Sequence, residues 1–140
     1  MKARFTPSLI TGNEMIDSHH KELIKRANDL FEAIEGRESK EKVLETLDFL
    51  AEYTTYHFGA EEKLMQEAKY PKYNEHKGYH EALVQVVGGL QEKLKNEGPT
   101  EEFEKEVNEK VVDWLYTHIK GCDHELAEYK NVRSQVDNML

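Results

Sequence analysis

The sequence predicts an all-α protein, an antiparallel up-down-up-down four-helix bundle. Apolar residues recur every three or four positions in four long stretches, which is the period of an amphipathic helix. Only 8 Gly and 3 Pro interrupt the 140 residues, so the helices can be long. No segment shows the alternation of apolar and polar residues that is typical of a half-buried strand. Four amphipathic helices joined by short connections are expected to run antiparallel to their neighbours.

The first helix is expected to follow an irregular N-terminal arm, residues 1–13. Its apolar stripe begins near Glu14 and runs to Gly36. Gly36 is expected to end this helix in a left-handed conformation. Ser39 is the candidate N-cap of the second helix.

The second and third helices are separated by Pro71, because the residue before a proline disfavours helix. The third helix is expected to start near Tyr73 and to be weakened locally by Gly88-Gly89, at about 1 kcal/mol per glycine relative to alanine. Gly98-Pro99 then makes a turn, and Thr100 can cap the fourth helix.

The fourth helix is expected to be interrupted by Gly121 and followed by a short C-terminal helix over residues 123–138. The bundle therefore spans residues 14–120, and residues 1–140 are interpreted as one domain. A length of about 100–150 residues suits a single domain with its own core.

Charge and cysteine content exclude several classes of function. Lys plus Arg number 19 and Asp plus Glu 28, so the formal charge of −9 makes the chain a poor partner for nucleic acid or anionic lipid. The single cysteine, Cys122, excludes an intrachain disulfide and a thiolate metal cage. The N-terminus lacks the apolar run of a signal peptide, and no stretch approaches about 18 consecutive apolar residues. We therefore expect a cytoplasmic protein without a membrane span.

The seven histidines carry the chemical signal. Five of them, and one glutamate, lie in register with the apolar stripes of four helices: His20, His57, Glu61, His76, His80 and His118. Buried polar groups without partners cost several kcal/mol each, so six of them would exceed the roughly 5–15 kcal/mol stability of a domain. A metal centre would compensate them, and imidazole with carboxylate suits iron, zinc, manganese or copper. The ligand number exceeds the need of one closed tetrahedral zinc ion and fits two ions better.

Asp123 is the candidate for a second carboxylate ligand. It follows His118 by five residues, which in a regular α-helix rotates it roughly 140° past the face of His118. An irregularity near Gly121 would therefore be needed to turn Asp123 inward. The alternative interpretation is an N-cap of the last helix. His19 and His124 lie out of register with the stripes and are expected to be solvated.

Four motifs share the spacing of one known family: IDSHHKEL (16–23), HFGAEEKLM (57–65), Tyr70-Pro71 with His76 and His80, and WLYTHI (114–119) with Asp123. Together they resemble the hemerythrins, in particular the single-domain bacterial hemerythrins, over about residues 8–130.

The resemblance implies reversible O2 binding at a non-heme di-iron centre, for oxygen transport, storage or delivery. It implies that three histidines bind one iron, namely His76, His80 and His118. It implies that His20 and His57 bind the other iron, which keeps an open position. Glu61, Asp123 and an oxo or hydroxo group would bridge the two Fe2+/Fe3+ ions. O2 would be the ligand, and an oxygen-consuming enzyme a candidate partner.

Apolar residues around an open iron position would exclude water and protons. The walls of this O2 pocket are expected to be Leu23, Phe58, Leu115 and Ile119, with Trp114 near the site. Two residues depart from the family pattern. Phe5 stands where many bacterial members carry tryptophan, and His19 is less usual at its place.

Other functions remain open at this point. A di-iron enzyme, such as a peroxidase or a nitric oxide reductase, would use the same site, but no acid–base pair beyond the ligands stands out. No residue is therefore assigned as catalytic, and binding is favoured over catalysis. A sensor of O2 or redox state would need a partner chain for its signalling module. Structural zinc would leave the site over-supplied with ligands.

Overall fold

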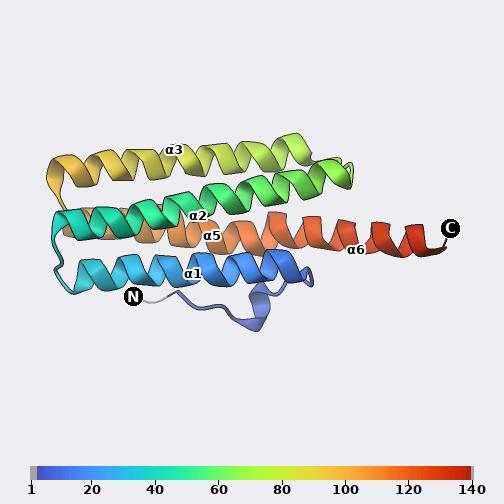
Figure 1. The fold of residues 1–140 in the computed structure, drawn as a ribbon, viewed down its shortest axis with the longest axis horizontal. Coiled ribbons are helices and arrows are strands. Elements are labelled where there is room, and N and C mark those ends of the chain that lie inside the picture. Colours follow the sequence, from blue (N-terminus) through green and yellow to red (C-terminus); the bar gives the residue numbers. More distant parts are fainter. Residues whose placement is uncertain (1–2, 140) are drawn as a thin grey trace.

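The computed structural model describes the backbone of residues 3–139 and the side chains of residues 3–133. Four helical rods lie side by side in this part of the chain, which contains no strand (Figure 1). The predicted four-helix bundle is confirmed. The first three rods are single helices: α1 (Glu14–Glu35), α2 (Lys40–Glu67) and α3 (Tyr73–Glu97).

The fourth rod is one helical run that contains two wide π-helical turns. Its segments are α4 (Glu101–Val107), η2 (Asn108–Val112), α5 (Asp113–His118), η3 (Ile119–Asp123) and α6 (His124–Met139). The interruption expected at Gly121 takes the form of the π turn η3, through which the backbone stays helical, and the expected C-terminal helix over 123–138 is α6. The turn η2 was not expected from the sequence. None of the described helices combines the length and apolar character needed to cross a bilayer.

Two of the predicted N-caps are confirmed. The side chain of Ser39 accepts a hydrogen bond from the backbone N–H of Lys42 at 3.1 Å. Thr100 accepts one from the N–H of Phe103 at 3.1 Å. These caps set where α2 and α4 begin.

The end of α1 differs from the prediction by one residue. Gly36 is not left-handed, since its φ is −75°, and Arg37 carries the positive φ of 54° instead. The N–H groups of Arg37 and Glu38 donate to the carbonyls of Ile34 and Ala33, both at 3.1 Å. This pair of bonds is a Schellman motif, which places the left-handed residue one position after the helix cap. Gly36 is that cap.

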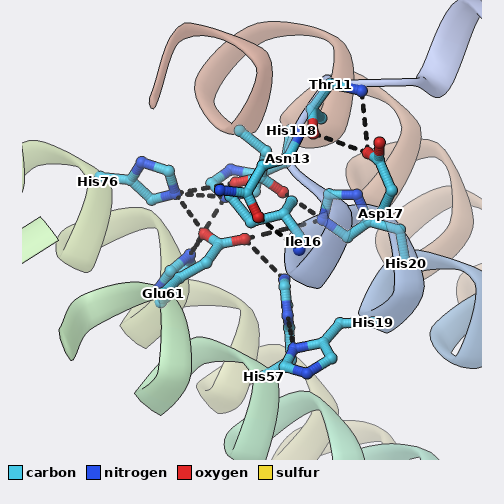
Figure 2. Close-up of polar contacts among 12 residues, drawn as sticks. Thr11, Asn13, Ile16, Asp17, His19, His20, His57, Glu61, His76 and His118 are labelled. Atoms are coloured by element: carbon cyan, nitrogen blue, oxygen red, sulfur yellow. Dashed lines mark hydrogen bonds and ion pairs between the residues drawn. The ribbon is translucent and has the colours of Figure 1, made fainter. Parts of the chain in front are cut away.

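The N-terminal arm includes a short 3-10 turn, η1 (Pro7–Leu9), and is anchored at the start of α1. The carboxylate of Asp17 accepts hydrogen bonds from the backbone N–H and the hydroxyl of Thr11, at 2.9 and 2.7 Å. Asn13 caps α1 by accepting from the N–H of Ile16 at 3.0 Å (Figure 2). Phe5 is partly buried against the main core. The arm thereby fixes the first turn of α1, close to His20.

Two clusters of buried apolar residues fill the bundle, and they lie on opposite sides of the buried histidines along the helix axes. The main cluster includes Leu30, Leu47, Leu94 and Phe103. The small cluster consists of Ile16, Met65, Tyr70, Leu126 and Ala127. The small cluster precedes His20 in α1 and follows Glu61 in α2 and Asp123 in the fourth rod. The polar residues therefore form a layer between two apolar ends.

Candidate metal centre

All seven predicted metal-binding residues face the interior of the bundle. Their exposed fractions are 5% for His118 and 2% or less for the other six. Every rod contributes at least one of them: His20 from α1, His57 and Glu61 from α2, His76 and His80 from α3, and His118 and Asp123 from the fourth rod.

The seven residues form two overlapping groups, in each of which one nitrogen or oxygen atom per residue lies within 4.8 Å of the others. The larger group contains His76, His80 and His118, and the smaller contains His20 and His57. Glu61 and Asp123 belong to both groups. The structure therefore places two carboxylates between three histidines on one side and two on the other.

Each shared carboxylate turns one oxygen toward each group. The Oε1 atom of Glu61 lies 3.0 Å from Nε2 of His76, and its Oε2 atom lies 2.7 Å from Nε2 of His57. The Oδ1 atom of Asp123 lies 3.0 Å from Nε2 of His76, and its Oδ2 atom lies 2.8 Å from Nε2 of His20. This division is what two carboxylates need in order to bridge a pair of ions.

Several of these atoms are close together without forming hydrogen bonds. Within the described part of the chain, seven buried side-chain atoms have no partner of hydrogen-bonding geometry, and six of them belong to this cluster: both ring nitrogens of His20, Nε2 of His57, both oxygens of Glu61 and Oδ1 of Asp123. In addition, Nε2 of His118 lies 3.0 Å from Nε2 of His76 and 3.2 Å from Nε2 of His80. Nitrogen lone pairs and carboxylate oxygens that converge in this way fit metal ions, and imidazole with carboxylate suits iron.

The buried charges perturb the titration of the site. Burial lowers the pKa of His20 and of His76, but contacts with Asp123 and Glu61 outweigh it and raise each pKa to about 9. Burial raises the pKa of Glu61, yet nearby histidines, His57 first, hold it well below its usual range. Burial and Glu61 raise the pKa of Asp123, and contacts with three histidines lower it overall. Without other cations, protons on the imidazoles therefore offset the carboxylates.

The inward position of Asp123 depends on the π turn η3 (Ile119–Asp123). This wider turn takes up one more residue than an α-helical turn, so it returns Asp123 to the face that carries His118. The irregularity expected between these two residues is therefore present. Asp123 is not the N-cap of a separate last helix, because its backbone lies within the helical run.

Two of the buried histidines have a partner at the nitrogen that faces away from the centre. Nδ1 of His80 lies 3.1 Å from a carboxylate oxygen of Glu62. Nδ1 of His57 lies 2.9 Å from Nδ1 of His19 (Figure 2). The expectation that His19 is solvated is wrong, because its ring is half-buried between α1 and α2. His124 is exposed, as expected.

The expected walls of the O2 pocket lie in or against the main core. Leu23, Phe58, Leu115 and Ile119 are buried, and Trp114 is half-buried. The ring of Phe58 stacks on His80 with centroids 3.8 Å apart and an angle of 4°.

Trp114 stacks on His118 at 4.4 Å and 12°. These two aromatic rings restrict the orientation of the histidines that they cover. A surface groove of about 420 Å³ between α2 and α3 lies next to the centre, and His80 is the one predicted ligand among the residues that line it.

Comparison with known proteins agrees with this geometry. The family model for the hemerythrin HHE cation binding domain matches residues 11–129. A bacteriohemerythrin from Pseudomonas aeruginosa is 31% identical over 115 residues, covering 82% of this chain and 72% of the relative. One from Stenotrophomonas maltophilia is 32% identical over 117 residues, covering 84% and 74%. One from Aquifex aeolicus is 30% identical over 117 residues, covering 84% and 88%.

Proposed function

Since this chain belongs to the hemerythrin family, an iron-binding family, we propose that it binds O2 reversibly at a di-iron centre. Its role would be to carry, store or deliver oxygen. An oxygen-consuming enzyme is one candidate recipient. One observation carries the proposal: Glu61 and Asp123 each direct one carboxylate oxygen toward one group of histidines and the other oxygen toward the second group.

The residues that would hold the irons follow from these two groups. His76, His80 and His118 would bind one ion, and His20 and His57 the other. Glu61 and Asp123 would bridge them, with an oxo or hydroxo group as a further bridge. The ion held by two histidines would have one protein ligand fewer, and the coordination position left over would be the one for O2. When bound, two ferrous ions supply the electrons that O2 binding draws on.

The chain's own contribution is to hold the ligands and to keep water away. Leu115 and Ile119 lie close to His118 in sequence, and their side chains are only 6% and 0% exposed. This burial supports their role as walls of the O2 pocket, together with Leu23 and Phe58, which are also buried. An apolar wall disfavours the entry of water and protons, which would otherwise promote oxidation of the irons. We therefore propose binding rather than catalysis.

The test is to purify the protein anaerobically, count its metals, reduce it and add O2. We expect two irons per chain and an absorption band that appears with O2 and disappears when O2 is removed. The Glu61→Ala variant is the non-binding control. Zinc without an optical change would overturn the proposal. Irreversible oxidation with consumption of added hydrogen peroxide or nitric oxide would indicate a di-iron enzyme instead.

A further inference from the structure

His19 lies outside the proposed ligand set but contacts one of its members across the α1–α2 interface. Its Nδ1 atom is 2.9 Å from Nδ1 of His57 (Figure 2). The two rings meet edge to face, with centroids 5.1 Å apart and an interplanar angle of 81°. The ring nitrogen of one histidine therefore points at the ring nitrogen of the other.

The direction of this hydrogen bond follows from the other nitrogen of His57. Nε2 of His57 lies 2.7 Å from Oε2 of Glu61 and is in the smaller group of converging atoms. A histidine that binds a metal through Nε2 carries its proton on Nδ1. His57 therefore donates, and His19 accepts through an unprotonated Nδ1. The proton of the His19 ring then sits on its Nε2.

The surroundings of His19 suit an acceptor. Its ring packs against Tyr53 and Tyr56, at centroid distances of 5.9 and 5.4 Å. A half-buried aromatic environment of this kind suits a neutral imidazole, which has a free lone pair at one ring nitrogen and can accept there.

We propose that His19 is a positioning residue of the metal centre, which fixes the tautomer and ring orientation of His57 by accepting its Nδ1 hydrogen bond. The proposal rests on the proposed role of His57 as a metal ligand. His80, in the other group, has the carboxylate of Glu62 at the same nitrogen. The two halves of the centre thus have different outer partners, one neutral and one anionic. An anionic partner makes an imidazole a stronger donor to a metal. The two ion positions would therefore differ in the donor strength of their histidines as well as in the number of histidines.

The test compares variants that keep or remove the acceptor at position 19. His19→Gln retains an acceptor oxygen, whereas His19→Phe retains a flat ring that packs between the tyrosines but accepts no hydrogen bond. His124→Phe, at the exposed histidine, is the matched control. The probes are Fe2+ under anaerobic conditions and Zn2+ alone, each titrated against a competing chelator. Thermal unfolding of the metal-free variants reports any loss of packing separately.

We expect His19→Phe to weaken binding of one ion by about 10–100-fold, the usual effect of losing an outer partner of a ligand. His19→Gln and His124→Phe should retain most of the affinity. In the zinc-loaded protein, the Nδ1 proton of His57 should shift upfield in the NMR spectrum of His19→Phe, because its hydrogen bond is lost. It should stay near its wild-type position in His19→Gln.

Equal affinities of His19→Phe and wild type would overturn the inference, as would equal impairment of the Phe and Gln variants. If metal-free His19→Phe unfolds too readily to be titrated, His19→Leu takes its place with the same expectations. A His57→Ala variant distinguishes the two levels of the proposal. Full metal binding by His57→Ala would overturn the proposed site itself. Impairment of His57→Ala alone would overturn only the role of His19.

Discussion

The Nε2 atom of His118 and the Oδ1 atom of Asp123 lie 3.0 Å apart, although five residues separate them in one helical run. An unbroken α-helix would point these side chains roughly 140° apart. The π turn η3 removes that difference, so the backbone of this turn is part of the metal centre.

The first prediction concerns the glycine within this turn. A Cβ added to Gly121 would meet nothing within 4 Å, and Gly121 lies in the helical run without a positive φ. Gly121→Ala should therefore leave the iron content unchanged and raise stability by up to about 1 kcal/mol through helix propensity. Metal analysis and thermal unfolding check this, with Gly89→Ala as a control at an equally open position. Loss of iron in Gly121→Ala would mean that the wide turn requires glycine.

The second prediction separates shared from unshared ligands. Glu61 contacts histidines of both groups, so Glu61→Ala should lose both ions. His20 belongs to the smaller group, so His20→Ala should keep the ion held by the other three histidines. Mass spectrometry of the intact protein counts the ions per chain. Glu67→Gln, at an exposed carboxylate of the same helix, should bind both. Retention of both ions by Glu61→Ala would contradict the bridging role.

The third prediction concerns the wall of the O2 pocket. Leu115→Ala should speed oxidation of the reduced protein in air, because the truncated side chain leaves room for water next to His118. Leu94→Ala is the matched control, since Leu94 is buried in the main core near the far end of α3. Both variants should lose about 2–5 kcal/mol of stability. An oxidation rate that rises equally in both would attribute the effect to loosened packing rather than to the pocket.

The fourth prediction is a pH dependence of the metal-free protein. The pKa of His20 and of His76 is raised from 6.5 to about 9, so their stabilising effect is complete below pH 6.5 and is lost as the pH rises through about 9. The pKa of Glu61 and of Asp123 is lowered from 4.5 and 3.8, so their contribution is present above those values and is lost in acid.

The free energy of unfolding without metal should therefore be highest between about pH 4.5 and 6.5 and fall by several kcal/mol toward pH 9, since each raised histidine pKa contributes up to about 3 kcal/mol. Urea unfolding with and without a chelator measures it. The iron-loaded protein should show the opposite trend over this range, because protons compete with metal for the same atoms. A metal-free protein that becomes more stable between pH 6.5 and 9 would contradict the charge pairing.

Much of the fold and the clustering of the seven residues could be predicted from the sequence. Helical periodicity identified the inward faces, and Ser39 and Thr100 identified two helix starts, because both signals act within one helix. The five-residue spacing of Asp123 also revealed the need for a wide turn near Gly121.

Features that depend on contacts between different helices could not be predicted from the sequence. His19 lies about 100° from the stripe of its own helix, so its contact with His57 depends on how α1 is rotated against α2. The turn η2 (Asn108–Val112) contains neither glycine nor proline, so nothing local marks it. Arg37 takes the left-handed position next to a glycine because of the carbonyl partners available at the end of α1.

The small cluster of Ile16, Met65, Tyr70, Leu126 and Ala127 has a consequence for how ions enter a buried centre. Separating this end of the bundle exposes less apolar surface than separating the end filled by the main cluster, so it requires less free energy. The first turns of α1 and α3, next to His20 and His76, can therefore separate briefly from the fourth rod while the rest of the bundle stays folded. Metal exchange would then follow the rate of this local opening, far faster than global unfolding.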